Sequence, residues 1–308
     1  MGYLSTLPVN SAISVVNTAT YCRGGKNDST YDKYLTGEGN TTIDIFRTYL
    51  GKPRTRITRA DMRTYSRNAG NEMLSYDQYK NIFYWLYVVE YANFNCQEAY
   101  NEELTYEGFR QGGLGAGVTT MEYVAFMKYG NDAVTPCGYG NEIGNGTGIK
   151  TINIPEIVID STTTLAAHTF DMPRWRGFDN PFGDIDTVLD GIIIDTDADN
   201  HENGMNYVYT CQDPSKYSDS LNENYKKVAE GFNNYAGAGS QIMSAYIKEF
   251  DLGDTAHIIG KVLGVEDPTT FKCDASYTFD RSNTPKIPRV GGYMTSTSTA
   301  GLGYAHLS

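Results

Sequence analysis

Residues 174–194 read Arg-Trp-Arg-Gly-Phe-Asp-Asn-Pro-Phe-Gly-Asp-Ile-Asp-Thr-Val-Leu-Asp-Gly-Ile-Ile-Ile, and we expect the fold of the chain to be organised around this stretch. Trp175, Phe178, Phe182 and Ile185 carry large apolar side chains. Burying such side chains is a main source of folding free energy, so they need a core. The stretch holds no obvious nucleophile, general base or metal cage, and it is therefore expected to be a structural nucleus.

Turns and a strand follow in the same stretch. Asn180-Pro181 and Gly183-Asp184 are residue pairs typical of tight turns. Ile192-Ile193-Ile194 is an uninterrupted β-branched run. Such a run is typical of a strand buried on both faces. We therefore expect aromatic anchors, a tight turn and then a central strand.

These residues also carry a resemblance. Arg176-Gly177, Asn180-Pro181, Gly183 and Asp190-Gly191 resemble the "RG-EN-GN-W-W-DG" signature of C-type-lectin-like domains of the formylglycine-generating-enzyme subtype. Similar domains occur in structural and fibre proteins of phages and prophages of gut bacteria. Further blocks of the chain that look like this family are residues 21–25, 85–97, 111–117 and 291–303.

One departure from the signature concerns its two tryptophans. Their positions hold Asp186 and Val188 in this chain, so packing around the turn is expected to differ. The resemblance implies an α+β, C-type-lectin-like fold, with two main helices packed on a small, mostly antiparallel twisted sheet and long irregular loops. We expect one such domain over 1–308, with an N-terminal extended and loop segment over 1–45 and a core with long insertions over 46–308.

The first expected helix is marked by its capping residues. Thr58 as N-cap with Asp61 near the helix N-terminus predicts a helix that runs to about residue 69, where Gly70 can end it. Arginines recur along it at helical spacing. The stripe that they form is either a solvated helix face or a contact for an anion or a glycan; its members are Arg59, Arg63 and Arg67.

The second expected helix is longer. Ser75-Tyr76-Asp77-Gln78 has the pattern of a capping box. Apolar residues then point in nearly all directions, which predicts a central helix over 76–100 that is buried on most sides. Glu90 in this run is either a core carboxylate held by backbone donors or an arginine, or a catalytic carboxylate.

Other segments are expected to be extended or irregular. Residues 1–20 suit one extended strand, and residues 149–159 suit a strand that Pro155 interrupts, which places it at an edge or a bulge. Residues 240–252 suit either a helix or a strand. Residues 255–265 are apolar, with His257 expected as a packed core residue.

Alternating aspartates follow the isoleucine run. Asp195, Asp197 and Asp199 resemble an EF-hand loop, but Asn200 and Asn206 stand where that loop needs glycine and glutamate. The segment is therefore either a solvated hairpin tip that leads into residues 206–210 or a looser Ca²⁺ site.

Composition narrows the class of protein. The 308 residues include 32 glycines and 25 tyrosines, a mixture common on loop-rich binding surfaces. The net charge of −12 argues against a general nucleic-acid surface. The five cysteines are far apart, without a C-x-x-C pair, so buried free thiols are expected. We expect no signal peptide and no membrane span.

The resemblance implies a non-enzymatic phage virion protein, a fibre or a head or tail appendage. Its expected partners are other virion proteins and a host-surface glycan or receptor. We expect a homo-oligomer located in the virion, assembled in the bacterial host cytoplasm, with no cofactor and no catalytic or metal-binding residues.

Two alternatives to this function come from related folds. A formylglycine-generating oxidase needs a close cysteine pair near the C-terminus, yet only Cys273 lies after Cys211. A calcium-dependent lectin needs Glu-Pro-Asn or Gln-Pro-Asp beside Trp-Asn-Asp, and none of these tripeptides is present. Metal-independent glycan binding through tyrosine rings remains open.

The candidate binding segment is 293–304, rich in Ser, Thr and Tyr. Short hydroxyls both donate and accept hydrogen bonds, and tyrosine rings offer flat amphipathic faces. The segment is either an ordinary strand pair or the contact face for a partner, as the matching stretch of related phage domains implies. The candidate binding residues are Tyr293, Thr295, Thr297, Thr299 and Tyr304.

Overall fold

The computed structural model describes part of the chain, in segments spread over both of its ends and its middle. The described residues are 5–7, 11–13, 58–68, 70–81, 143–154, 157–158, 161–162, 164–165, 167–179, 181–196, 205–233, 243–252, 258–262, 275–278, 285–293 and 301–307. The chain divides into two compact units, Met1–Glu72 with Gly117–Asp184, and Met73–Ala116 with Ile185–Ser308. The single domain over 1–308 stays a prediction.

In the first unit, helix α2 spans Arg59–Asn68 and confirms the predicted capping. The backbone N–H of Asp61 donates to the Thr58 hydroxyl, at 3.1 Å, as an N-cap requires. At the other end, Gly70 has a φ of 74° and donates to the carbonyl of Arg67, while Asn71 donates to the carbonyl of Ser66. This pair of bonds is the Schellman arrangement, which a left-handed glycine permits.

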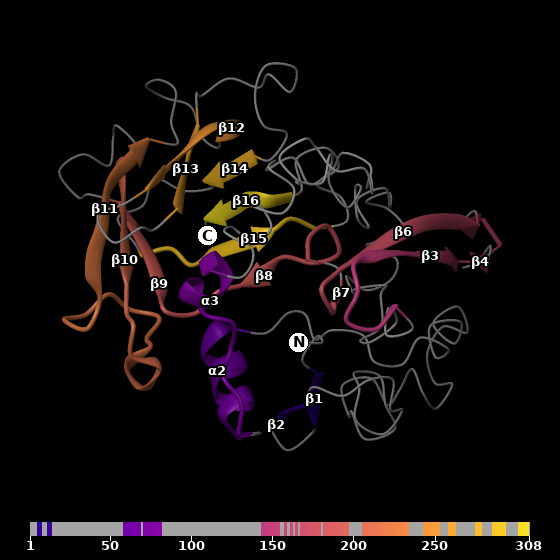
Figure 1. Ribbon diagram of the computed structural model, residues 1–308, viewed down its shortest axis with the longest axis horizontal. Coiled ribbons are helices and arrows are strands. Elements are labelled where there is room, and N and C mark those ends of the chain that lie inside the picture. Colours follow the sequence, from indigo (N-terminus) through magenta and orange to yellow (C-terminus); the bar gives the residue numbers. More distant parts are fainter. Residues whose placement is uncertain are drawn as a thin grey trace. The chain divides into compact units, whose positions relative to one another are not determined.

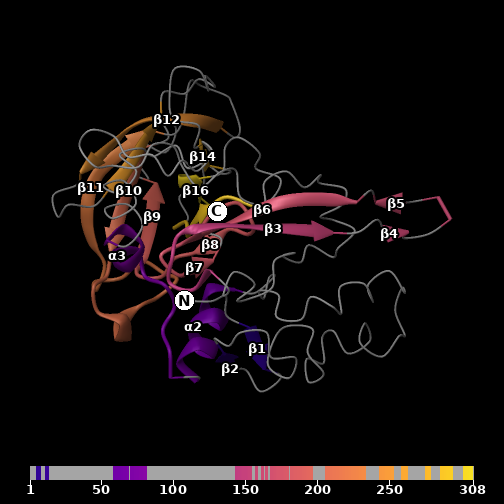
Figure 2. The same ribbon diagram turned by 45° about the vertical axis from the view of Figure 1, so that its right-hand side comes forward.

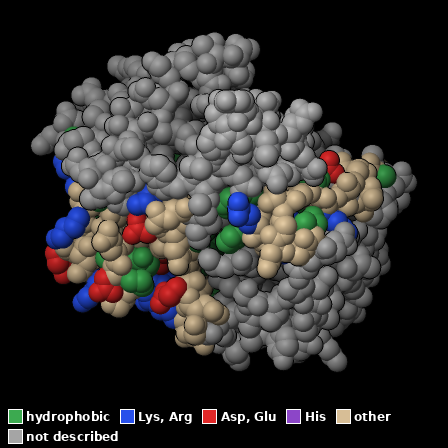
Figure 3. All heavy atoms as spheres, viewed as in Figure 1, with side chains coloured by type: hydrophobic (Ala, Val, Ile, Leu, Met, Phe, Trp, Pro, Cys, Tyr) green, Lys and Arg blue, Asp and Glu red, His purple; other side chains and the backbone are tan. Residues whose placement is uncertain are grey.

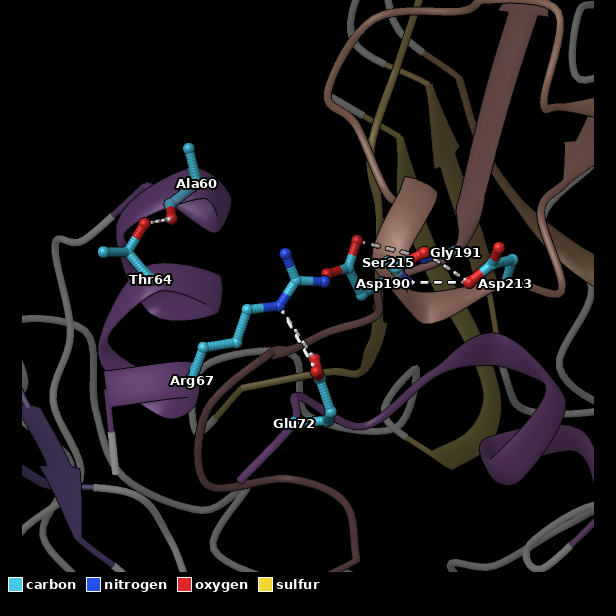
Figure 4. Close-up of polar contacts among 8 residues, drawn as sticks. All are labelled: Ala60, Thr64, Arg67, Glu72, Asp190, Gly191, Asp213 and Ser215. Atoms are coloured by element: carbon cyan, nitrogen blue, oxygen red, sulfur yellow. Dashed lines mark hydrogen bonds and ion pairs between the residues drawn. The ribbon is translucent and has the colours of Figure 1, made fainter. Parts of the chain in front are cut away.

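The arginine stripe of α2 does not form the solvated face that was one of its two predicted roles. Arg59 and Arg63 are only 3% and 8% exposed. Arg67 is more exposed, and its Nε lies 3.2 Å from a carboxylate oxygen of Glu72 (Figure 4). A surface pair of this kind contributes at most about 1 kcal/mol.

The first unit also contains a three-stranded antiparallel sheet in the order β3-β6-β7, formed by Gly148–Ile154, His168–Trp175 and Phe178–Asp179. Strands β4 (Ile157–Val158) and β5 (Thr164–Leu165) form a further pair along the same ribbon (Figure 2). The predicted strand with a break at Pro155 is confirmed, because β3 ends at Ile154 and lies at the sheet edge.

A tight turn joins β6 to β7. Trp175 pairs with Phe178, and the two residues between them, Arg176 and Gly177, have φ values of 47° and 87°. Positive φ at both central positions is the type I′ hairpin turn, which matches the right-handed twist of its strands. Trp175 is 0% exposed, so its predicted place in a core is confirmed.

The N-terminal segment differs from the single extended strand that was expected. Two short strands, β1 (Ser5–Leu7) and β2 (Ser11–Ile13), pair with each other as an antiparallel hairpin. The three residues between them include Pro8 and Asn10, which favour a turn over a continuous strand.

In the second unit the described strands form a three-stranded and a six-stranded sheet (Figure 1). The first, in the order β11-β10-β9, consists of Lys226–Asn233, Met205–Thr210 and Ile192–Thr196. The second, in the order β13-β12-β14-β16-β15-β8, consists of Ile258–Val262, Met243–Leu252, Ala275–Thr278, Gly301–Leu307, Pro288–Gly291 and Thr187–Val188. Among the described strands, all pairings are antiparallel except β14 with β16, and the isolated bridge between Ser75 and Asp190 is also parallel.

Strand β9 confirms one part of its prediction and corrects another. Ile192, Ile193 and Ile194 are all nearly inaccessible to solvent, as a strand buried on both faces requires. The strand is not central, however, because it lies at one end of its three-stranded sheet. On that side Ile194 exchanges two backbone hydrogen bonds with Lys286, which satisfies the edge locally.

Two shorter elements complete the second unit. Helix α3, Tyr76–Tyr79, begins with the predicted capping box: Gln78 N–H donates to the Ser75 hydroxyl, and the Gln78 side chain accepts from Ser75 N–H. The rest of the predicted helix 76–100 beyond residue 81, with Glu90, lies outside the described residues. The 3₁₀ turn η5, Pro214–Lys216, is capped by Asp213, which accepts from Ser215 (Figure 4).

The described residues thus form an α+β structure with few helices and several small, mostly antiparallel sheets. Residues 243–252, which suited either a helix or a strand, are a strand. None of the helices in the described segments is long and apolar enough to cross a membrane. On the face seen in Figure 3, described basic and acidic side chains are interspersed.

Candidate functional site

The candidate binding segment is anchored by a strand pair of the second unit. Strands β15 and β16 pair antiparallel, with Val290 opposite Ala305 and Gly291 opposite Gly301. Gly291 and Gly292 have φ values of 89° and 74°, a backbone that glycine adopts without strain. Residues 292–300 therefore join two strand ends that are paired with each other.

The five predicted binding residues fall in different places relative to this anchor. Tyr293 follows the two glycines and is half-buried. Tyr304 lies in β16, where the register jumps from Ala305 to Gly301 while β15 advances by one residue. Such a jump is a bulge, and bulges redirect side chains next to functional sites. Thr295, Thr297 and Thr299 lie outside the described residues.

A compact polar cluster lies on the same strand pair. Arg289 of β15 is opposite His306 of β16, and Asp186 precedes β8, which pairs with β15. An Nη1 nitrogen of Arg289 lies 3.4 Å from Asp186 Oδ2, and its Nη2 contacts His306 Nδ1. His306 Nδ1 lies 3.7 Å from the same Asp186 oxygen. The side chains of Asp186 and His306 are largely buried, while that of Arg289 is one-third exposed.

Donor chemistry constrains the histidine ring in this cluster. The Nη2 of Arg289 lies against both ring nitrogens of His306, at 3.3 Å from Nε2. A guanidinium has only N–H donors, so a ring nitrogen that accepts from Arg289 carries no proton. Burial lowers the pKa of His306 below its ordinary value of 6.5, and the positive charge of Arg289 acts in the same direction against the partial support of Asp186.

A second polar arrangement surrounds Asp190 and Gly191. Asp190 is 0% exposed, and its backbone pairs with the start of α3: Tyr76 N–H donates to its carbonyl, and its own N–H donates to Leu74. One carboxylate oxygen accepts from the N–H of Gly191, at 3.0 Å (Figure 4). Asp190 therefore fastens β9 to the capping box of α3.

Tyr217 covers this junction. A Cβ placed on Gly191 would lie 2.8 Å from two carbons of the Tyr217 ring, so the ring occupies the space that any other residue would need. Burial raises the pKa of Tyr217 to about 12, although a hydrogen bond with Ser75 opposes the shift. The ring also packs against the core cluster of Ile193, Cys211 and Tyr225. The polar groups at this junction therefore have a structural role, because they connect β9 to α3.

The residues considered for metal binding and the cysteines lie only partly within the described segments. Asp195 is half-buried in β9, and β9 and β10 form the predicted hairpin, whose tip with Asp197 and Asp199 lies outside the described residues. Within the described segments, no group of three or more His, Cys, Asp or Glu side chains could hold a metal ion. Cys211 is a buried free thiol as predicted, whereas His257 and the other four cysteines lie outside the described residues.

Comparison with protein-family models, with curated proteins and with solved structures finds no match to this chain. The sequence interpretation missed Arg289, His306 and Tyr217. One signal pointed toward the first two: Asp186 stands where the signature has a tryptophan, and a charged residue in a buried place needs a partner.

Proposed function

We propose that this chain is a non-enzymatic phage virion protein, a fibre or a head or tail appendage. In this proposal a C-type-lectin-like domain makes contact with a host surface or with a neighbouring virion subunit. The observation that carries the proposal is the anchoring of the Ser/Thr/Tyr-rich segment 292–300 between the paired residues Gly291 and Gly301. Binding residues are commonly carried on connections held by a rigid scaffold.

The positions of the signature glycines support the resemblance on which the proposal draws. Gly177, Gly183 and Gly191 have φ values of 87°, 88° and 72°, a region that side chains with a Cβ rarely adopt. The Asp190 carboxylate and backbone also satisfy local donors and acceptors. The signature residues therefore set the backbone conformation at turns and do not present reactive side chains. This role suits a scaffold that carries a contact segment.

The chemistry of the segment suits a polar partner. Threonine and serine hydroxyls can match the hydroxyls of a glycan or the backbone of a protein, and a tyrosine ring adds apolar area with few rotatable bonds. The partner is accordingly a host glycan, a receptor or an adjacent virion protein, and the protein itself is a homo-oligomer. The contact requires no cofactor.

The experiment replaces the candidate residues and measures the contact. Tyr293, Thr295, Thr297 and Tyr304 are changed together to Ala, and the particles that carry the variant are tested for assembly and for attachment to host cells. We expect an unchanged fold and loss of one of these two contacts. Because Tyr304 lies within β16, a second variant changes only Thr295, Thr297 and Thr299, whose small side chains make misfolding less of a concern.

A matched control changes polar surface elsewhere in the same unit. Tyr207 on β10 is half-buried, while Gln212 and Ser220 are exposed. Their combined replacement by Ala should leave assembly and attachment as in the wild type. Normal assembly and attachment of both test variants would place the contact face outside this segment and would refute the proposal.

A further inference from the structure

The Asp186 cluster takes the place of a packed aromatic residue. In the resembled signature this position holds a tryptophan, whereas here it holds a carboxylate whose side chain is only 11% exposed. Moving a charge from water into such a site costs several kcal/mol unless it is paired. Arg289 supplies the opposite charge, and the His306 ring lies 3.7 Å from the same carboxylate oxygen. Both residues belong to the β15–β16 strand pair.

The cluster leaves two hydrogen-bonding atoms unused. Asp186 Oδ1 and Arg289 Nε are buried and make no hydrogen bond within the described residues. The carboxylate therefore has one oxygen that accepts no hydrogen bond from the described residues. The ring is within 3.7 Å of the other oxygen of the same carboxylate, so a small rotation of either side chain would bring them into hydrogen-bond contact.

We propose that Asp186, Arg289 and His306 form an acid-released latch that fastens β8 to the β15–β16 strand pair. With a neutral ring, Arg289 bridges the two partners, because its Nη1 forms an ion pair with Asp186 and its Nη2 lies against the ring of His306. The latch therefore reinforces the short pairing of β8 with β15, which consists of only two residue pairs, Arg289 with Val188 and Val290 with Thr187.

Protonation of the ring changes which groups can bind each other. A proton on Nδ1 turns this nitrogen from an acceptor into a donor, so it can no longer accept from Arg289. The imidazolium and the guanidinium then repel each other, and both compete for Asp186. Arg289 is the more exposed of the two cations and moves toward water, while His306 donates to the carboxylate. The bridge between β8 and β15 is lost.

Two charged groups in the described part of the chain face the ring: Asp186 from the segment before β8 and Arg289 from β15. In the parallel register of the strands, Tyr277 of β14 is opposite His306. Because burial and Arg289 hold the pKa of His306 below 6.5, the latch is closed at neutral pH. The folded state loses stability as pH falls below 6.5 toward the folded pKa, since the unfolded chain binds the proton first.

Hydrogen exchange tests the latch directly. Protection factors of the Thr187 and Val188 amides are measured from about pH 8 to about pH 5, with the intrinsic pH dependence of exchange removed. We expect the protection factors of these two amides to fall as the pH is lowered. The fall should be about tenfold for each unit by which the pKa of His306 in the folded state lies below its ordinary value. Amides of β10, in the other sheet, serve as the internal reference and should change less.

Two substitutions separate the latch from general acid sensitivity. His306→Gln keeps an acceptor for Arg289 and cannot take up a proton, so the protection of β8 should become independent of pH in this range; His306→Asn provides a second variant if the first fails to fold. Asp186→Asn should lower the protection of β8 already at neutral pH. An unchanged acid response in the His306 variants, or a wild type without an acid response, would overturn the proposal.

Discussion

Replacement of Gly191 by Ala tests how strongly one residue determines the junction between β9 and α3. Gly191 has a φ of 72°, and its added Cβ would lie 2.8 Å from Cε1 and Cζ of Tyr217 and 2.9 Å from its hydroxyl oxygen. Real Cβ atoms essentially never approach so closely, so either the ring or the backbone must move.

The magnitude follows from two separate costs. A left-handed backbone costs a residue with a Cβ about 1–2 kcal/mol. The ring of Tyr217 can swing away only by losing its hydrogen bond with Ser75 and part of its packing on the core cluster, which adds about 1–3 kcal/mol. The smaller conformational entropy of unfolded alanine offsets about 0.4–1 kcal/mol of this sum. Gly191→Ala should therefore destabilise the second unit by about 1–5 kcal/mol.

Chemical denaturation of single and double variants measures both costs. Gly70 is the matched control for the backbone, because its φ is 74° and nothing lies within 4 Å of an added Cβ. Gly70→Ala should cost only about 1 kcal/mol. Tyr217→Ala removes the ring, so Gly191→Ala in that background should show the backbone cost alone. The resulting coupling energy between the two sites should be about 1–3 kcal/mol.

Two results would refute the reasoning about this junction. One is a Gly191→Ala variant whose loss of unfolding free energy, relative to the wild type, is no larger than that of Gly70→Ala. The other is strict additivity of Gly191→Ala and Tyr217→Ala, since additive sites do not share a steric conflict.

Two further predictions concern the aromatic residues. Trp175→Ala should destabilise the first unit by about 3–5 kcal/mol, because a fully buried ring stacked on Phe178 is lost. Ile149→Ala, at a side chain that is 38% exposed, should change the denaturation midpoint little. Equal midpoints for the two variants would contradict the assignment of the core. Because the unfolded chain loses the Tyr217 phenol proton first, the folded state should lose stability as pH rises from about 10 toward about 12. Tyr217→Phe should reduce this loss of unfolding free energy at alkaline pH. An unchanged dependence of unfolding on pH would exclude Tyr217 as its source.

Local signals in the sequence predicted the local structure. Thr58 with Asp61, Gly70 and the Ser75-Gln78 capping box lie where the helix ends require them, because each satisfies backbone groups within a few residues. The apolar run at 192–194 likewise predicted its own burial. Such features depend on nearest neighbours in the chain, so a sequence contains enough information to place them.

Tertiary contacts decided what depends on distant partners. Arg59 and Arg63 are buried although their spacing suited a solvated face, because the surroundings of a helix side are supplied by other segments. The same cause makes β9 an edge strand: its position depends on which strands pair with it.

The candidate site shows the same division. The sequence by itself determined that residues 293–304 are rich in hydroxyls and that Asp186 departs from the resembled signature. Only the tertiary structure decided that β15 and β16 pair, and thereby that Arg289 and His306 meet Asp186 from about a hundred residues further along the chain. The physical reason is that a buried charge requires a partner of opposite charge wherever it lies. Which residue becomes that partner depends on how the folded chain brings distant segments together.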